Sequence, residues 1–389
     1  MPTYCFNRAF QYIRVKYLSK WYATMKVIFV QCWIQPWWAT EVLKDIVDHT
    51  KFSHASIYAL ISSEKWLKTK KHTVKIYTIL PSRLNALFAS NQQIRRKKIF
   101  DHRYLIAIAP LCMRYMSRKI HKTKTDKIIV SSFAIAKNID TNNIPTTLYL
   151  HSPMQYIRTH ADEYRSKLKG TQSFIRSQIS PYLQRRDKQY TTFDKVYSNS
   201  LYTAQAAKEI YRIESTVVYP QIDTIFYNQQ ISTTPQSYYV YIWRLVRFVK
   251  ELDRIIIANN TLWFPLIIIG SGPDEQYLKD LAQDNTIFIP RTSTEQYIKI
   301  LKEAKGLINI TKESFGIVTA QAIALWVPVL GYNGWATPEL INKGNGFLID
   351  DKENQTIIQQ RRKFDQYTFN RKAIHEQAKQ NKNSTFVEF

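Results

Sequence analysis

The sequence predicts an α/β protein of two domains, each built around a parallel β-sheet. Short runs rich in β-branched and aromatic residues alternate with helical stretches along the chain, the pattern of strands joined by crossover helices. The chain has 389 residues, of which 45% are hydrophobic, so it can bury a large core. At roughly 100–200 residues per domain, two domains are expected.

Ten segments are predicted to form strands, and a polar stretch divides them into two sets. The first set is Val27–Val30, Ser56–Ala59, Ile128–Ser131, Thr147–Leu150 and Val196–Ser198, and the second is Tyr238–Ile242, Leu266–Ile269, Thr286–Ile289, Gly306–Ile310 and Val327–Gly331. Residues 223–237, rich in Gln, Thr and Ser, predict a linker. We therefore expect an N-terminal domain over residues 25–222 and a C-terminal domain over residues 238–389.

Residues 1–24 form an extension outside this pattern, basic and aromatic without clear periodicity. Met25 is followed directly by the first predicted strand, so we expect translation to begin there. No apolar run approaches the roughly 18 residues of a spanning helix, and the N-terminus lacks a signal-peptide core. The three cysteines, Cys5, Cys32 and Cys112, are widely spaced and indicate neither a disulfide framework nor a metal cluster. A cytoplasmic location is predicted.

The net charge of +25 favours an anionic partner, although an AT-rich genome gives the same composition. Basic clusters lie at Arg95–Lys98, Arg118–Lys119, Lys122–Lys127 and Arg185–Arg186. A solvated face explains each cluster, and peripheral docking on the anionic inner face of a membrane is the functional alternative. Nucleic acid comes third, because basic and aromatic residues do not interleave as in known nucleic-acid modules.

Two loops in the second half carry residues suited to a diphosphate. Arg244 and Lys250 follow the strand that ends at Ile242, and their side chains bind phosphate oxygens by forked hydrogen bonds and by point charge. Gly270 and Gly272 lie at the next strand-to-helix junction, as in nucleotide-binding α/β units. Each pair alone is weak evidence.

A third segment, Glu313-Ser-Phe-Gly-Ile-Val, is more specific. An acidic residue precedes a glycine that opens a helix, so the amides of Phe315, Gly316, Ile317 and Val318 are predicted to form an anion site. The Glu313 carboxylate can accept hydrogen bonds from sugar hydroxyls.

The order of strand, basic loop, Gly-Ser-Gly-Pro turn and Glu-x-Phe-Gly-Ile resembles glycosyltransferase family 4, especially its bacterial mannosyltransferase-like members. The resemblance runs from about Met25 to the C-terminus. It implies the GT-B fold, two Rossmann-like domains that face each other across a cleft. It also implies a retaining transfer of a hexose, with mannose from GDP-mannose as the best guess, onto a lipid-linked or polysaccharide acceptor. No metal or other cofactor is expected.

The resemblance assigns roles to single residues. His151, in Leu150-His-Ser-Pro-Met-Gln-Tyr156, would contact the transferred sugar near its anomeric centre, although by itself it reads as a structural histidine after a strand. Arg244 and Lys250 would hold the donor diphosphate, and Glu313 with the helix amides would hold sugar and phosphate. Gln321 stands where the family usually has a glutamate that contacts the ribose, and Gln155 replaces an arginine.

Tryptophan and glycine are equally common, at nine residues each, and the tryptophans fall at unusual places. In the family pattern, glycine belongs at five positions that hold tryptophan here: Trp37, Trp38, Trp243, Trp326 and Trp335. Trp263 lies where glycine suits a turn before a strand. Trp21, Trp33 and Trp66 have no such interpretation. Our hypothesis is that UGA codons read as glycine were translated as tryptophan; the alternative is a decayed homologue.

Two other functions stay open at this stage. The chain taken literally favours a catalytically inactive homologue that binds a sugar nucleotide or a glycan. Its charge alone favours a basic nucleic-acid-binding protein, which the motifs do not support, so no nucleic acid partner is expected.

Overall fold

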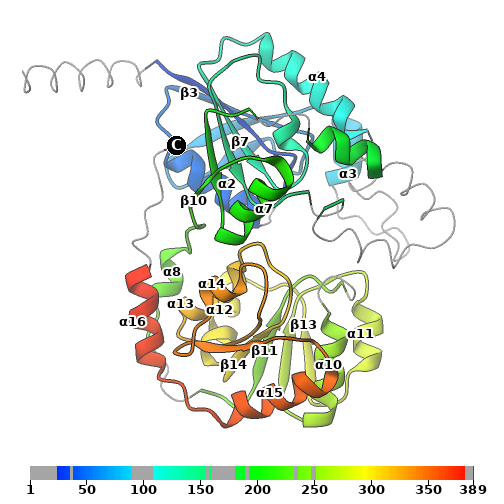
Figure 1. The fold of residues 1–389 in the computed structure, drawn as a ribbon, viewed down its shortest axis with the longest axis vertical. Helices are drawn as coiled ribbons and strands as arrows, with labels where there is room; N and C mark the ends of the chain where they lie inside the picture. The colour runs from blue at the N-terminus through cyan, green and yellow to red at the C-terminus, as the bar shows by residue number, and fades with distance from the viewer. Residues whose placement is uncertain are drawn as a thin grey trace, which may run out of the picture.

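The computed structural model describes residues 24–35, 38–89, 108–154, 157–158, 180–188, 192–231, 235–246, 251–381 and 389. The predictions for Trp37, Gln155, Lys250 and the cluster Arg95–Lys98 lie outside the described residues. The chain folds into two layered α/β units, one above the other in Figure 1.

The N-terminal unit is built on an eight-stranded sheet with the order β10-β9-β8-β7-β1-β3-β6-β5. Its strands are β1 Lys26–Val30, β3 His54–Ala59, β5 Trp66–Lys68, β6 Thr73–Thr78, β7 Lys127–Ser132, β8 Thr146–Leu150, β9 Lys195–Ser198 and β10 Thr216–Val217. All neighbours pair in parallel except β5 and β6. A separate short pair joins β2 Trp33–Ile34 to β4 Ile61–Ser62.

Helices cover both faces of this sheet (Figure 1). They are α2 Trp38–Asp48, α3 Ser82–Ala89, α4 Ala109–His121 and α7 Leu201–Tyr211, with a 3-10 turn η2 at Ala136–Asn138. Successive strand residues point to opposite faces, and in β1 Val27 and Phe29 pack with α2 while Ile28 and Val30 pack with α4 and α7. Burial on both faces explains why the central strands are continuously apolar.

The C-terminal unit has a six-stranded parallel sheet with the order β13-β12-β11-β14-β15-β16. Its strands are β11 Tyr239–Ile242, β12 Leu266–Ile269, β13 Thr286–Ile289, β14 Gly306–Asn309, β15 Val329–Tyr332 and β16 Gly346–Ile349. The helices are α8 Thr224–Tyr227, α10 Leu252–Leu262, α11 Glu275–Leu281, α12 Thr294–Glu303, α13 Ile317–Ala324, α14 Thr337–Leu340, α15 Asn354–Gln366 and α16 Arg371–Asn381. Two apolar clusters, one on each face of the sheet, form the core.

The predicted fold class is confirmed, and each of the ten predicted strands overlaps an observed one. The prediction missed β2, β4, β5, β6, β10 and β16. Three of these strands have only two residues, too short for a periodic pattern. Among the helices of the described residues, none combines the length and the apolar character needed to cross a bilayer.

The two units meet through the N-terminus of α7. The Glu339 carboxylate of α14 accepts the backbone N–H groups of Leu201 and Tyr202, each at 2.8 Å, and so caps a helix of the other unit. The Tyr219 hydroxyl donates to the same carboxylate at 3.0 Å. Burial, with a smaller contribution from this carboxylate, raises the pKa of Tyr219 to about 12.

Phe389 also joins the two units, because it lies against the N-terminal sheet although the predicted C-terminal domain includes it. Its ring packs on Tyr197 at 5.1 Å and on Tyr149 at 5.9 Å between ring centroids.

A buried ionic cluster forms the polar part of the N-terminal core. Asp187 lies with one carboxylate oxygen 3.3 Å from Lys137 Nζ and the other 3.2 Å from Arg158 Nε. The Tyr211 hydroxyl donates to the second oxygen at 2.8 Å. Burial lowers the pKa of Lys137, and Asp187 opposes this shift. The buried Asp187 carboxylate is therefore balanced by two cations and a hydroxyl together.

Asp187→Asn is therefore expected to destabilise the protein strongly, because it leaves the Lys137 ammonium buried without a counter-charge. Breaking a buried pair in this way costs about 3–5 kcal/mol, measurable as the free energy of unfolding in urea. The control is Glu214→Gln, which breaks the exposed Lys208–Glu214 pair at 2.9 Å and should leave stability unchanged within error. Equal losses in the two variants would contradict the role given to the cluster.

Candidate functional site

The predicted donor residues lie at the carboxyl edge of the C-terminal sheet. Arg244 follows β11, Gly270 follows β12 and Glu313 follows β14, and β11 pairs in parallel with both of the other strands. Parallel neighbours end at the same edge, so the three loops are adjacent. Arg244 is exposed there.

The glycine pair is required by close packing of two of these loops. A Cβ at Gly270, whose φ is +152°, would lie 1.9 Å from the carbonyl oxygen of Trp243, and a Cβ at Gly272 would lie 2.2 Å from that of Leu245. The Leu245 N–H also donates to the carbonyl of Ser271 at 3.1 Å. The glycines thus hold the Arg244 loop against the next turn.

A chain of buried polar side chains supports Glu313. Asn309 donates from Nδ2 to Thr319 Oγ1 at 2.9 Å, and Thr311 Oγ1 lies 2.7 Å from both Asn309 Oδ1 and Glu313 Oε1. A hydroxyl has one proton, so Thr311 donates to one of these oxygens at a time. The Glu313 carbonyl accepts from the Ala336 N–H at 3.1 Å.

Helix α13 opens with uncapped amides, as predicted. Gly316 is its N-cap residue with φ +92°, and no side chain caps the helix. The N–H groups of the first turn have no partner inside a helix, which makes such a terminus suitable for phosphate. One turn further, the Gln321 Oε1 accepts the Tyr297 hydroxyl at 2.6 Å, which leaves the Nε2 of that amide to donate to a ligand.

His151 is fully buried, and its hydrogen bonds fix its tautomer. Gln31 donates from Nε2 to the Trp33 carbonyl at 3.0 Å, so its Oε1 accepts the Ser131 hydroxyl at 2.7 Å. Ser131 has then no proton left for His151 Nε2 at 2.8 Å, and this nitrogen must donate. The other ring nitrogen, Nδ1, is an acceptor without a partner among the described residues.

Burial also decides the charge of His151. It lowers the pKa of the ring to about 3, so the imidazole is neutral at physiological pH. The indole of Trp38 covers it, with the ring centroids 5.1 Å apart and the planes at 78°.

Thr203 brings His151 and the Glu313 loop together across the junction. Its hydroxyl lies 3.4 Å from the carbonyl oxygens of both His151 and Ser314. Ser200, the N-cap of α7, donates to the Ser314 carbonyl at 2.5 Å. Residues from both sheets therefore meet at one place.

Four polar atoms at this junction are buried without a hydrogen-bond partner among the described residues: His151 Nδ1, Ser152 Oγ, Asn199 Nδ2 and Ser314 Oγ. Asn199 follows β9, next to the strand that precedes His151, and its N–H donates to the Leu150 carbonyl at 3.2 Å. Buried polar groups are nearly always paired in folded proteins. A cluster of unpaired ones indicates a site for a polar ligand, and the sequence analysis missed all of them except His151.

Two of the predicted glycine-position tryptophans have the backbone conformation that favours glycine. Trp326 and Trp335 both have φ of +56°, and Trp263 has +57°. Trp38 and Trp243 are not among the described residues with positive φ. Trp335 stacks on Tyr202 of α7 across the junction, with the centroids 4.8 Å apart and the planes at 12°.

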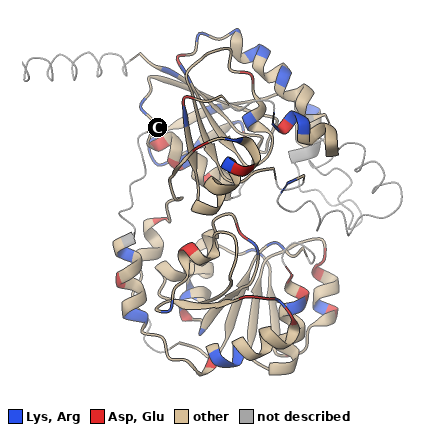
Figure 2. Ribbon diagram, in the orientation of Figure 1, with Lys and Arg blue, Asp and Glu red and all other residues tan. Residues whose placement is uncertain are grey.

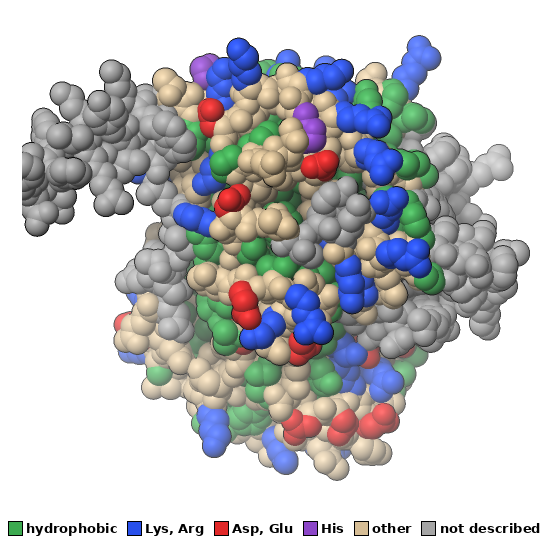
Figure 3. All heavy atoms as spheres, turned by 45° about the horizontal axis from the view of Figure 1, so that its top comes forward, with side chains coloured by type: hydrophobic (Ala, Val, Ile, Leu, Met, Phe, Trp, Pro, Cys, Tyr) green, Lys and Arg blue, Asp and Glu red, His purple; other side chains and the backbone are tan. Residues whose placement is uncertain are grey.

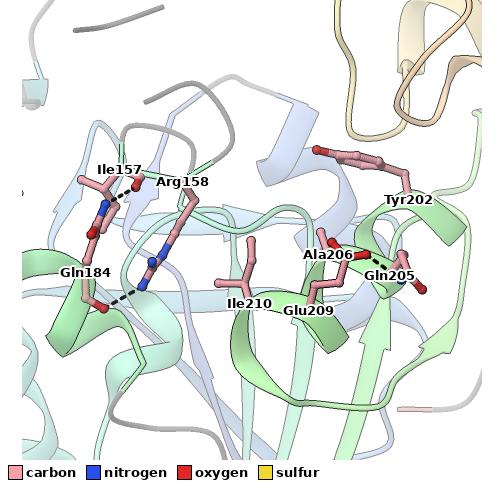
Figure 4. A pocket seen from close by; sticks show the side chains of 8 residues that line it. All are labelled: Ile157, Arg158, Gln184, Tyr202, Gln205, Ala206, Glu209 and Ile210. Carbon is pink, nitrogen blue, oxygen red and sulfur yellow. Dashed lines mark hydrogen bonds between the residues drawn. The ribbon is translucent and has the colours of Figure 1, made fainter. Parts of the chain in front are cut away.

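A separate pocket of about 550 Å³ opens on the N-terminal unit (Figure 4). Its lining residues are Ile157, Arg158, Gln184, Tyr202, Gln205, Ala206, Glu209 and Ile210. Arg158 is fixed there, since its Nη2 donates to the Gln184 carbonyl at 2.7 Å. Tyr202 borders both this pocket and the junction. Within the described part of the chain, no group of three or more His, Cys, Asp or Glu residues is arranged to hold a metal ion.

The depressed pKa of His151 predicts a loss of stability in mild acid. The unfolded ring binds a proton below about pH 6.5 and the folded ring only near 3, so stability falls as the pH decreases through this window. Between pH 7.5 and pH 5 the loss is about 2 kcal/mol. Urea unfolding across this range should show a steeper pH dependence for the wild type than for His151→Gln. Parallel curves would contradict the neutral, buried state.

Comparison with known proteins agrees with this fold. Residues 226–381 match the family model described as Glycosyl transferases group 1. No curated protein matches the chain. Among solved structures, WaaG, a glycosyltransferase involved in lipopolysaccharide biosynthesis, has a TM-score of 0.64 at 13% identity over 92% of this chain and 95% of that chain.

Two further structures share the fold at similarly low identity. Anabaena HepE in complex with UDP and glucose has a TM-score of 0.56 at 16% identity, over 93% of this chain and 100% of that chain. Sucrose-phosphate synthase from Thermosynechococcus elongatus has 0.63 at 12% identity, over 92% and 98%. The chain therefore has the GT-B fold, and its residues 226–381 match the Glycosyl transferases group 1 model.

Proposed function

We propose that this protein is a retaining glycosyltransferase of family 4 that moves a hexose from a sugar nucleotide to a lipid-linked or polysaccharide acceptor. The observation that carries the proposal is the junction itself. His151 and the Glu313 loop lie on either side of Thr203, beside the open amides of α13 and a cluster of unpaired polar atoms. A sugar supplies the hydroxyls that such atoms lack.

The proposed mechanism depends on electrostatic positioning. Arg244, Lys250 and the α13 amides neutralise the leaving diphosphate without a metal ion. Glu313, held by Thr311, accepts hydrogen bonds from sugar hydroxyls. Neutral His151 offers the Nδ1 lone pair as a further hydrogen-bond acceptor for the sugar. It therefore orients the sugar without carrying a charge.

Two sugar nucleotides are candidates for the donor. GDP-mannose, which would donate mannose, is the first candidate because of the motif resemblance. UDP-glucose is the second, because a structural neighbour was solved with UDP-glucose. A binding screen over both donors, read by the change in melting temperature, separates them.

The acceptor is proposed to enter through the 550 Å³ pocket. Its aromatic ring, two side-chain amides and oppositely charged Arg158 and Glu209 suit the apolar faces and the hydroxyls of a glycan. Tyr202 lines the pocket (Figure 4) and also stacks on Trp335 at the junction.

Helix α4 supports docking on an anionic membrane surface. The helix and its C-cap residue expose apolar and basic side chains together: Leu111, Arg114, Tyr115, Arg118, Lys119 and, at the C-cap, Lys122. These positions recur at three- and four-residue intervals and so share one side of the helix. Lys and Arg gather along the part of the N-terminal unit that carries α4 (Figures 2 and 3). Apolar residues that insert and cations that meet phosphate headgroups are the combination of an interfacial helix.

One observation favours an inactive, glycan-binding homologue as the second candidate. In the sequence as printed, the rings of Trp38, Tyr149 and Phe133 pack around the fully buried His151, so a sugar cannot reach the ring. Transfer or donor hydrolysis by the printed sequence would exclude this candidate.

Glu313→Ala is expected to reduce sugar transfer at least 100-fold, the usual effect of removing one group that stabilises a transition state. The assay uses the protein with glycine at positions 37, 38, 243, 326 and 335, so that the donor can enter. Glu295→Ala, which removes an exposed carboxylate at the start of α12, is the control and should transfer normally. Normal turnover by Glu313→Ala would disprove the role of this residue.

The variant Arg118→Glu, Lys119→Glu, Lys122→Glu reverses three charges at the C-terminal end of α4. It should no longer cosediment with vesicles that contain anionic phospholipid. Each basic residue near such a surface contributes about 1 kcal/mol. The matched control reverses Arg362, Lys363 and Lys372, which are exposed on α15 and α16. Equal binding by both variants would show that net charge, and not α4, drives the association.

A further inference from the structure

Left-handed backbone conformations single out tryptophan in this protein. The non-glycine residues with positive φ in the described chain are Asn142, Asn143, Arg212, Glu251, Trp263, Trp326 and Trp335. Asparagine is commonly found in this region, whereas a bulky aromatic residue is a genuine outlier. Three tryptophans among seven such residues need a common cause.

Trp326 occupies the position of a helix end that most often requires glycine. Its N–H donates to the Ile323 carbonyl at 2.9 Å, and the N–H of Val327 donates to the Ala322 carbonyl at 2.8 Å. This hydrogen-bond pair defines a Schellman motif whose left-handed residue is Trp326. The indole is completely buried, and its Nε1–H has no hydrogen-bond partner among the described residues.

Trp263 repeats the pattern at the end of α10. It is the left-handed residue that stops the helix, with its N–H donating to the Asn259 carbonyl at 2.8 Å. Its side chain is 59% exposed, so packing does not compensate for the backbone strain. The short connection to β12 at Leu266 fixes this turn whichever residue occupies it.

Trp38 and Trp335 instead fill space at the junction. Trp38 lies over the His151 ring, and Trp335 occupies the space between its own loop and Tyr202. Both indoles therefore occupy space beside the groups proposed to bind the sugar. The tryptophans therefore share either a strained backbone or an obstructed site.

We propose that positions 38, 263, 326 and 335 carry glycine in the protein made by its own cells, because UGA codons there are read as glycine. The same proposal includes positions 37 and 243. The argument from the obstructed site rests on the proposed function, whereas the argument from backbone strain does not.

The preserved polar networks argue against decay. A gene that had lost its function would accumulate substitutions of many kinds, including at the groups that hold Glu313 and His151. Both networks are complete, from Thr319 through Asn309 and Thr311, and from Gln31 through Ser131. The residues that stand at glycine positions of the family pattern are all tryptophan, and Gln155 and Gln321 are the other departures from that pattern.

The decisive test reads the gene and the native protein. We expect UGA at positions 38, 263, 326 and 335 and UGG at position 33, where the residue is buried in β2 with an ordinary backbone. Peptides of the protein purified from its own cells should then have the mass of glycine at the UGA positions. UGG at 263, 326 and 335, or peptides that contain tryptophan there, would overturn the proposal.

A stability comparison tests the backbone argument without any ligand. Trp326→Gly and Trp33→Gly remove equally buried indoles, but only the first residue is left-handed. We expect Trp326→Gly to keep or raise the melting temperature by a few degrees, and Trp33→Gly to lower it by more than that. Similar large losses in both variants would show that the Trp326 indole belongs to the native core, which would overturn the proposal at that position.

Donor binding separates this proposal from the proposed function. If the chain with glycine at all six positions melts at a higher temperature but no GDP- or UDP-sugar shifts it further, the recoding stands and the transferase assignment fails. If the codons are UGG and the printed chain binds a sugar nucleotide, the recoding fails and the donor site stands.

Discussion

The contact of α7 with the Ser314 turn is the constraint on which the site depends. Two parallel sheets present their carboxyl edges to each other, and loops at such edges have unpaired amides and side chains. Ser200 and Thr203 bind the Ser314 carbonyl, while Glu339 caps α7 from the opposite unit. These bonds hold His151 within reach of the Glu313 loop. They also bury polar atoms that protein groups alone do not satisfy.

The strands of the core could be predicted because burial on both faces of a parallel sheet leaves an apolar run in the sequence. Nine of the ten strands found in this way are interior ones, such as β1 and β11, and the tenth, β13, lies at an edge. The interior strand β6 was missed because its buried and exposed residues alternate. Short edge strands such as β5 and β10 lie where one side is open to solvent, and their sequences do not differ enough from those of loops. Their existence depends on a neighbouring strand that is distant in the sequence.

The candidate site was predicted where the local sequence determines the local geometry. The glycine that opens α13 and the acidic residue before it can be recognised in a single segment. Ser152 and Asn199 could not be recognised, because only the folded structure shows that their side chains are buried without a partner among the described residues. Thr203 could not be recognised either, because its importance comes from contacts with residues 52 and 111 positions away. The function of Ser131 is of the same kind, since it depends on Gln31 one hundred residues earlier.

The tryptophans show why a backbone can reveal more than a side chain. Whether a residue adopts a left-handed conformation is decided by the helix before it, the strand after it and the hydrogen bonds that join them. At position 326 these bonds join backbone groups only, so the motif is open to glycine as well as to tryptophan. The strain is therefore a property of the residue type and not of the fold. A fold that repeatedly demands glycine and repeatedly contains one other residue type points to the translation of the gene and not to the evolution of the protein.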